Sequence, residues 1–207
     1  MRLYEIEDIE LNPGEKTEIH SAGEGYDKYV PIIKKYCSES LQAMKQAGKP
    51  LLRGFTDEMR DAFVGVPRNN RITFTNKQIV QFFNEQFAEA GIIANRSNAI
   101  STTTTKGGAK GFGELYYLFP VNGFKFSWSP AIFDFGHEFA GMKVDEVIEL
   151  FKQTGAKSIV DWLEFTDKDF VAALKSGNEI SIYGRYVAIK ILEPYYHGYL
   201  MPKLGIK

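Results

Sequence analysis

The chain has 207 residues, of which 44% are hydrophobic and 25% are charged. This length and composition predict one folded domain with its own core, and they exclude a disordered or collagen-like chain. Lys and Arg number 25 against 26 Asp and Glu, for a net charge of −1, which excludes a strongly basic field over the whole protein. A local basic patch for nucleic acid is still compatible with this charge.

Cysteine and histidine usage limits disulfides and metal sites. Cys37 is the single cysteine, so it has no disulfide partner within the chain, and with three scattered histidines it cannot build a Cys/His zinc site. We therefore predict no metal. No apolar run approaches the roughly 20 residues that cross a bilayer, and the acidic N-terminal segment lacks the apolar stretch of a signal peptide. We expect a cytoplasmic protein without a membrane partner, in the host cytoplasm if the chain is viral.

Helical patterns dominate the first part of the chain. Residues 1–24 predict a short strand and a loop, and residues 26–47 carry apolar side chains at steps of three and four, which predicts a helix that Gly48 ends. A buried strand at 51–55 and an irregular segment at 56–71 follow. A second helix is predicted at 77–90, with Thr75 or Asn76 as its cap.

From residue 92 the pattern becomes that of strands. Residues 92–94 and 98–105 are rich in β-forming residues, and residues 115–121 and 124–128 predict a β-hairpin around Asn122-Gly123. The glycine cluster at 107–113 matches neither common phosphate-binding pattern, so it predicts a mobile loop.

The last part of the chain combines short helices with the best-patterned strands. Helices are predicted at 145–152, 157–164 and 168–175, the third with a capping box of Thr166 and Asp169. Two alternating strands follow at 179–183 and 186–192, with a turn at Gly184-Arg185.

Helices that lead and strands that follow indicate an α+β fold. We predict a single domain over residues 1–207. Its parts are a helical N-terminal part at 1–48, a sheet-rich core of mixed or antiparallel strands at 49–193, and an irregular tail at 194–207.

Three features of the sheet-rich core carry the chemistry. Arg53 lies inside an apolar strand, where a guanidinium is costly unless it is paired or faces a cleft, and Gly54 permits close approach of a ligand or another backbone. A Ser/Thr row at 100–105 presents hydroxyls that can hold a ribose or position a carboxylate. Glu179 begins the late strand, at an edge suited to a cleft. Each feature alone also fits a structural role: an ion pair, a solvated strand or a strand end.

In this order, the Leu-Leu-Arg-Gly, Ser-Thr-Thr and Glu-Ile-Ser-Ile-Tyr-Gly segments resemble the Arg–Ser–Glu signature of the clostridial-toxin-like ADP-ribosyltransferases, whose phage-encoded members are of similar length. The resemblance spans residues 51–192. It implies an ADP-ribosyltransferase-like sheet core and NAD as substrate. Cleavage of the nicotinamide–ribose bond would transfer ADP-ribose to a protein or nucleic-acid acceptor.

The resemblance also assigns roles to residues of this chain. Glu179 would be catalytic, Arg53 with Gly54 would hold the pyrophosphate, and Ser101 with Thr102 would orient the ribose and Glu179. One of the 29 aromatic residues would stack on the nicotinamide, with Phe112, Tyr116 and Tyr117 as examples. Arginine-modifying members carry Glu or Gln two residues before the catalytic Glu, and Gly177 stands there instead, so other acceptors become as plausible.

Other residues suggest weaker alternatives. His137 beside Glu138 would be an acid/base pair or a surface histidine, and Cys37 an inert buried thiol. The alternative function is a non-enzymatic viral, structural or nucleic-acid-binding protein. It would use a surface of arginines among aromatics, or the edge strand 124–128 as a packing surface. The residues of that arginine–aromatic surface are Arg60, Arg68, Arg71, Arg96, Phe74, Phe82 and Phe83.

Overall fold

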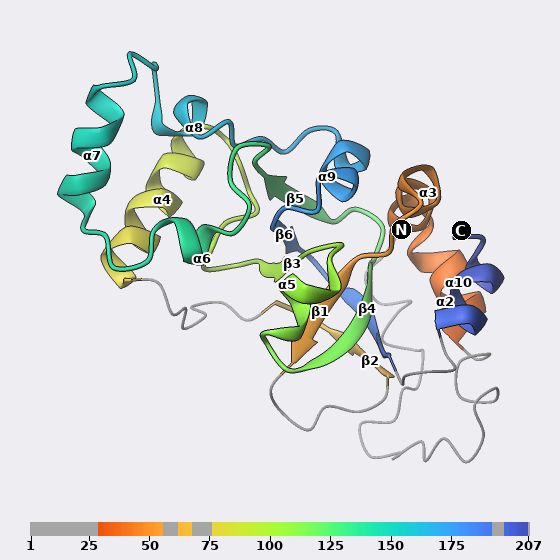
Figure 1. Ribbon diagram of the computed structural model, residues 1–207. Helices are drawn as coiled ribbons and strands as arrows, with labels where there is room; N and C mark the ends of the chain where they lie inside the picture. The colour runs from red at the N-terminus through yellow and green to blue at the C-terminus, as the bar shows by residue number, and fades with distance from the viewer. Residues whose placement is uncertain (1–28, 56–61, 68–75, 192–196, 207) are drawn as a thin grey trace.

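The structure, a computed structural model, describes residues 29–55, 62–67, 76–191 and 197–206 (Figure 1). The strand predicted within 1–24 lies outside these residues. The predicted N-terminal helix is two helices, α2 (Tyr29–Tyr36) and α3 (Ser38–Ala47), which meet at the buried Cys37. Gly48 ends α3 with a φ of +66°, a conformation that glycine adopts without the steric cost of a Cβ.

The strands form two antiparallel sheets, which confirms the α+β class. The first sheet has the order β1-β4-β7-β2, and the second has the order β3-β6-β5. The first sheet contains β1 (Leu52–Phe55), β4 (Glu114–Pro120), β7 (Tyr186–Lys190) and β2 (Ala62–Gly65). The second contains β3 (Ile100–Thr102), β6 (Ile180–Tyr183) and β5 (Lys125–Trp128).

The predicted hairpin between β4 and β5 is wrong. A turn does form at Asn122-Gly123, with Gly123 at a φ of +81°, but β4 pairs with β1 and β7 while β5 pairs with β6. After the turn at Gly184-Arg185 the chain returns from the second sheet to the first, since β6 belongs to the second sheet and β7 to the first. At both turns the chain therefore passes from one sheet to the other. Within the second sheet, β6 lies in the middle because it pairs with both β3 and β5.

Several predicted boundaries also need correction. Residues 62–65, predicted irregular, form β2 at the edge of the first sheet. Residues 92–94 belong to a loop, in which the side chains of Asn95 and Asn98 bond nearby backbone groups instead of leaving them to a strand partner. Asp169 alone caps α9 (Phe170–Ser176) by accepting a hydrogen bond from the amide of Ala172.

The tail predicted to be irregular contains a helix, α10 (His197–Leu204). Leu200, Met201 and Leu204 are buried at helical spacing, and α10 packs beside α2. Apolar contact with α2 thus stabilises a segment whose own sequence, with Pro202 inside the helix, gives little helical signal.

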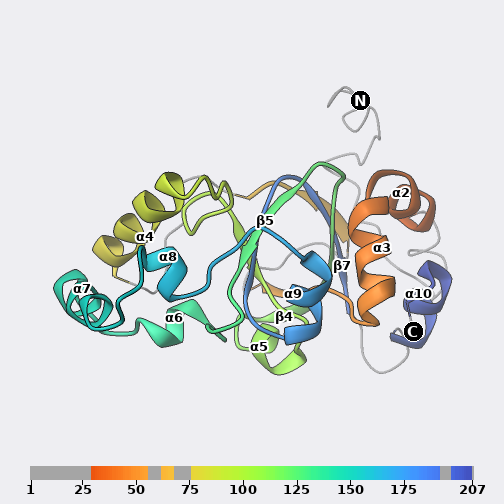
Figure 2. The ribbon, with the colours of Figure 1, turned by 90° about the horizontal axis from the view of Figure 1, so that it is seen from above.

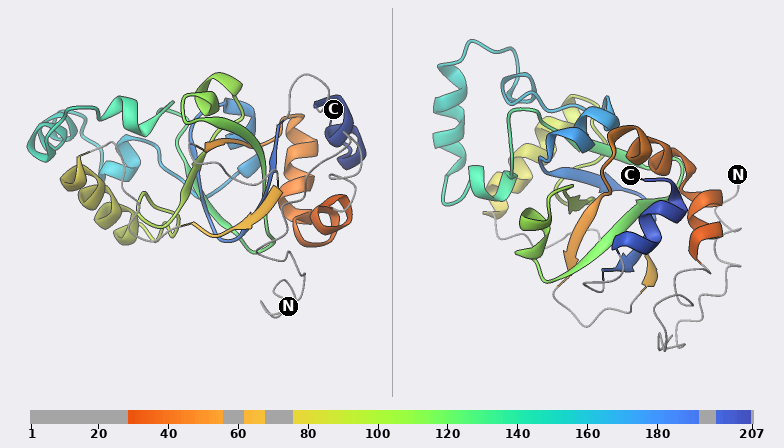
Figure 3. Two further views of the ribbon diagram at one scale, coloured as in Figure 1. Left: turned by 90° about the horizontal axis from the view of Figure 1, so that it is seen from below. Right: turned by 45° about the vertical axis from the view of Figure 1, so that its right-hand side comes forward.

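Helices flank the two sheets on opposite sides. Figures 2 and 3 show α2, α3 and α10 on one side and a group of four helices on the other. We call this group the helical lobe: α4 (Lys77–Glu89), α6 (Phe135–Glu138), α7 (Val144–Lys152) and α8 (Ile159–Trp162). No helix of the described segments is long and apolar enough to span a membrane.

Two hydrophobic clusters match this arrangement. The larger cluster joins the sheets to α2, α3, α9 and α10. The smaller one lies inside the helical lobe and is rich in phenylalanine, with Phe83 in edge contact with Phe135 at 4.8 Å between ring centroids. Arg53, Ser101 and Glu179, which the sequence analysis selected as site residues, line one pocket of this structure.

Candidate functional site

The two sheets meet where β1 approaches β3. Leu52 and Thr103 exchange backbone hydrogen bonds of 2.7 and 3.0 Å, which link the edges of the two sheets. The next residue, Arg53, donates from Nη1 to the carbonyl oxygen of Ser101 at 2.9 Å. The arginine that the sequence placed in an apolar strand therefore lies at the junction of the sheets.

Sheet register brings Ser101 and Glu179 together. Ser101 pairs with Ser181 across β3 and β6, and Glu179 lies two residues before Ser181, so the side chains of Ser101 and Glu179 are diagonal neighbours on one face. The Ser101 hydroxyl donates to Oε1 of Glu179. Strand pairing thus helps to bring together two residues that are 78 positions apart in the sequence.

The threonines after Ser101 fix the backbone that leads to Glu179. Thr104 donates to the carbonyl of Leu174 at 3.0 Å, Thr103 to that of Gly177 at 2.8 Å, and Thr102 to that of Ile180 at 2.7 Å. The predicted row of hydroxyls therefore acts on protein backbone. It holds the segment around Glu179 in place, which is the preorganisation that a catalytic group requires.

The helical lobe holds Glu179 from its other side. The amide of Glu179 donates to the carbonyl of Phe133 at 2.8 Å, and the amide of Phe135 donates to Oε2 of Glu179 at 2.9 Å. Asp134, between these two residues, caps α6 by accepting a hydrogen bond from the amide of His137 at 2.8 Å. The start of α6 is thereby fastened to the carboxylate.

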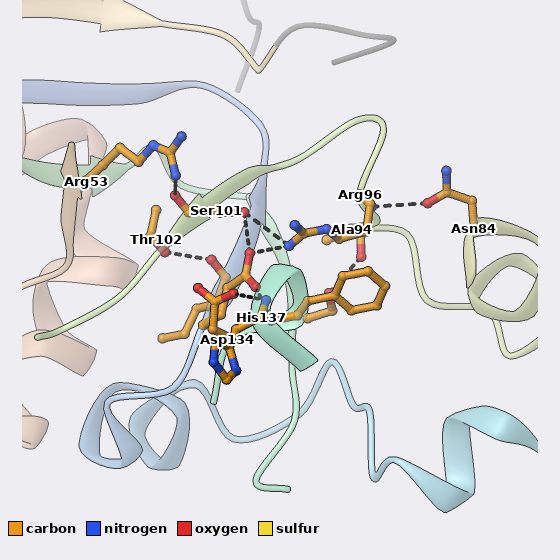
Figure 4. A network of polar contacts seen from close by, with 12 residues as sticks. Arg53, Asn84, Ala94, Arg96, Ser101, Thr102, Asp134 and His137 are labelled. Carbon is orange, nitrogen blue, oxygen red and sulfur yellow. Dashed lines mark hydrogen bonds and ion pairs between the residues drawn. The ribbon is translucent and has the colours of Figure 1, made fainter. Parts of the chain in front are cut away.

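Arg96, which the sequence analysis placed in the alternative arginine–aromatic surface, lies beside Glu179 instead. Its Nη1 contacts both Oε1 of Glu179 and, at 3.2 Å, Oγ of Ser101 (Figure 4). Arg53 and Arg96 approach Ser101 from opposite sides in this view. Arg96 lies in a loop rich in asparagine, a pattern that predicts the loop but not its neighbours in space.

Opposing effects act on the pKa of Glu179. Burial of the carboxyl raises its pKa, because the charged form loses its hydration. The charge of Arg96 and the hydrogen bonds from Ser101, the Phe135 amide and Arg96 lower it, and together they outweigh burial. The pKa of Glu179 lies below its usual range, so the group is a carboxylate at neutral pH.

One pocket includes four of the five predicted site residues. It is lined by Arg53, Ser101, Thr102 and Glu179, together with Leu52, Thr103, Gly108, Ala109, Phe112, Phe133 and Asp134. Its volume of about 360 Å³ includes space that is open to solvent. The arginine, hydroxyl and carboxylate that the sequence predicts are within reach of a single ligand.

Gly54 is placed differently. A Cβ on this residue would lie 2.9 Å from the carbonyl carbon of Phe112 and 3.0 Å from the amide nitrogen of Gly113, and closer still to the carbonyl oxygen of Ala109. Of the two alternatives that the sequence left open, the close approach is that of another backbone. Gly54 lies outside the pocket lining, so its role toward a cofactor stays a prediction, supported here only indirectly through the packing of residues 109–113.

The glycine cluster contains a short helix, α5 (Lys106–Lys110), where a mobile loop was predicted. Gly108 and Ala109 of this helix line the pocket, and Phe112 follows them. The ring of Phe112 lies 4.7 Å from the guanidinium carbon of Arg53, a cation–π contact that orients the arginine.

The three candidate stacking aromatics separate clearly. Tyr116 and Tyr117 are fully buried in the larger cluster, away from the pocket lining, so they cannot stack on a ligand there. Phe112 does line the pocket. Phe133, which the sequence did not single out, also lines it and is 60% exposed. Phe112 and Phe133 are therefore the aromatic residues available to a ligand within the described lining.

Other predicted candidates lie apart from this pocket. His137 and Glu138 are exposed on α6 and do not line it. Cys37 is buried and contacts the carbonyl of Phe119 at 3.3 Å, and burial raises the pKa of its thiol to about 12. A thiol with that pKa carries almost no thiolate at neutral pH, as expected of an inert cysteine.

The alternative arginine–aromatic surface finds little support among the described residues. Arg96 points inward to Glu179, and Phe83 is fully buried in the helical lobe. Arg60, Arg68, Arg71 and Phe74 lie outside the described residues. The edge strand β5 is partly covered, because Trp128 pairs with Thr166 and Phe126 packs against Phe170 at 4.8 Å.

A pocket with an arginine at one end and a buried, hydrogen-bonded carboxylate at the other can bind an anion and stabilise a positive charge that develops nearby. Comparison of the chain with protein-family models, with curated proteins and with solved structures finds no match. The chemistry of the site is therefore inferred from its own residues.

Proposed function

We propose that the protein is a mono-ADP-ribosyltransferase that cleaves NAD and transfers ADP-ribose to a macromolecular acceptor. The observation that carries the proposal is that Arg53, Ser101 and Glu179, which resemble the Arg–Ser–Glu signature in sequence, line one pocket. Arg53 lies on β1, Ser101 lies on β3, and Glu179 directly precedes β6. Hydrogen bonds connect both Arg53 and Glu179 to Ser101. The two-sheet core with its antiparallel strands is compatible with a transferase-like fold.

Arg53 is suited to the pyrophosphate of NAD. A guanidinium binds phosphate oxygens with two parallel N–H donors, and the contacts with Ser101 and Phe112 fix its orientation toward the pocket. Phe112 or Phe133 offers an aromatic face for the nicotinamide ring at the same pocket.

Glu179 is suited to the ribose next to the nicotinamide. In the reaction the bond between C1′ and the nicotinamide nitrogen breaks, its electron pair leaves with the nicotinamide, and the ribose gains oxocarbenium character. A carboxylate that is anionic and fixed before the reaction stabilises this positive charge without reorganisation. A lone pair of the acceptor then forms the new bond to C1′, and the acceptor loses a proton to solvent.

The acceptor is not restricted to arginine side chains. Gly177 has a φ of +83° at the end of α9, where a Glu or Gln would be strained. A Cβ there would meet Thr105 at 3.0 Å. The chain therefore lacks a carboxylate two residues before Glu179, so we propose a protein or nucleic-acid acceptor without choosing between them.

Transfer of label from NAD tests the proposal. The protein is incubated with NAD that is radiolabelled in the adenylate phosphate, together with cell extract, and the macromolecular fraction is then treated with protease or nuclease. We expect label in that fraction, and the treatment that releases it identifies the acceptor class. The control is NAD labelled in the nicotinamide, which must transfer nothing. Equal label from both would overturn the proposal.

A further inference from the structure

Arg96 holds Glu179 from the side away from the pocket. It contacts Glu179 Oε1 and Ser101 Oγ, and its guanidinium carbon lies 4.6 Å from the ring of Phe135. Its side chain is nine-tenths buried, and it does not belong to the pocket lining, whereas Glu179 and Ser101 do. Arg96 therefore contacts the Glu179 carboxylate without lining the pocket itself.

The loop around Arg96 is built to keep it there. The backbone amide of Arg96 donates to Asn84 Oδ1 on α4 at 3.1 Å, and the Asn95 side chain accepts hydrogen bonds from the amides of Ser97 and Asn98. Within the described part of the chain, the buried Nε of Arg96 has no hydrogen-bond partner.

Most hydrogen-bond acceptor positions of the Glu179 carboxylate are occupied by donors of the described residues. A carboxylate offers about four lone-pair positions. Among the described residues, Arg96 and Ser101 donate to Oε1 and the Phe135 amide donates to Oε2, so three of the positions are taken. The remaining position belongs to Oε2, on a residue that lines the pocket.

We propose that Arg96 is a positioning residue of the transferase reaction, which holds the Glu179 carboxylate anionic and oriented with one acceptor position open to a ribose hydroxyl. This inference rests on the proposed function. It also specifies the role of Glu179: a carboxylate held in this way accepts one hydrogen bond and stabilises charge, and it is a poor general base. The acceptor nucleophile must then lose its proton to solvent or to a group of its own.

A pH dependence follows from this arrangement. Among the described residues, the charged groups near Glu179 are Arg96 from the loop after α4, Arg53 from β1, and Asp134, the residue that caps α6. Without Arg96, burial still raises the pKa of Glu179, and the largest opposing charge is gone. Protonation of Glu179 should then reduce activity at a higher pH than in the wild type.

Four variants, of which Arg185→Gln is the control and Arg96→Ala serves for chemical rescue, test the role of Arg96. Arg96→Gln removes the charge, Arg96→Lys keeps it, and Arg185→Gln is the matched control in the turn between β6 and β7, outside the pocket lining. For Arg96→Gln we expect kcat to fall about 100-fold with KM for NAD nearly unchanged, because its donor acts on the carboxylate and not on the substrate. Its acid limb should move to higher pH, Arg96→Lys should retain most of the wild-type profile, and millimolar guanidinium should partly rescue Arg96→Ala.

A second readout does not depend on NAD. The carboxyl carbon of Glu179 is titrated by NMR in the wild type and in Arg96→Gln, and the variant should titrate at higher pH. If the wild type does not cleave NAD but this shift appears, the proposed function fails while the hold of Arg96 on Glu179 stands. If the wild type is active and Arg96→Gln keeps its kcat, its pH profile and the wild-type titration of Glu179, the role proposed for Arg96 is overturned.

Discussion

At the scale of single residues, the site is a carboxylate surrounded by donors. Glu179 receives hydrogen bonds from a hydroxyl, a guanidinium and a backbone amide that come from three different elements. Each donor favours the ionised form, and together they overcome the cost of burial. The proposed reaction requires such a carboxylate, ionised and held in place before NAD binds.

Arg53→Lys separates the charge of this residue from its shape. Lysine keeps the positive charge but loses the planar pair of donors and the stacking on Phe112. We expect affinity for NAD to fall roughly tenfold, which corresponds to about 1.4 kcal/mol. Isothermal calorimetry with NAD measures this, and Arg185→Lys is the control. Unchanged affinity in Arg53→Lys would contradict the phosphate role of Arg53.

Sequence reasoning worked best for residues that were unusual in their local setting. Arg53 was noticeable because a charge interrupted an apolar strand, and Glu179 because it began a strand of clear alternation. Arg96 and Phe133 had no such local signal. Their roles depend on which parts of the chain fold beside Glu179, and neither periodicity nor turn chemistry contains that information.

At the scale of elements, strand positions were easier to predict than strand partners. The segments of β1, β4, β5, β6 and β7 were recognised from their patterns, and α4 began after Asn76 as one of the two expected caps. The Asn-Gly turn, however, indicates only that the chain reverses. Whether the strands on its two sides pair is decided by competition with β1, β6 and β7, which are distant in sequence.

Gly54 connects β1 to the pocket wall formed by α5 and Phe112. Because a Cβ on Gly54 would overlap the backbone of residues 109–113, Gly54→Ala must displace this wall or β1. We expect the free energy of unfolding to fall by about 1–3 kcal/mol, the usual cost of overpacking. Urea denaturation followed by circular dichroism measures it.

Gly107→Ala is the matched control for Gly54→Ala. Gly107 lies in α5, the short helix that packs against Gly54, and a Cβ at Gly107 would meet nothing within 4 Å. This variant should therefore be as stable as the wild type or slightly more stable. Equal stability of all three proteins would show that Gly54 does not set the approach of α5 to β1.

At the scale of the whole molecule, the site lies where independent parts of the structure meet. The first sheet supplies Arg53, the second sheet supplies Ser101, and Glu179 directly precedes its strand β6. The helical lobe supplies the Phe135 amide, and the loop after α4 supplies Arg96. The switching of the chain between sheets at Asn122-Gly123 and Gly184-Arg185 makes this meeting possible. A substitution in the helical lobe can therefore alter the position of Glu179 through the Phe135 amide, even though Phe135 does not line the pocket.

Release of free nicotinamide from NAD tests the central claim most directly. It is measured by chromatography for the wild type and for Glu179→Gln, which keeps the size of the side chain and removes its charge. We predict that the wild type releases nicotinamide and that the variant does so about 100 to 1,000 times more slowly, the usual cost of losing such an electrostatic contact. Equal release by both proteins, or no release by the wild type with or without cell extract, would contradict the claim that Arg53, Ser101 and Glu179 form an NAD-cleaving site.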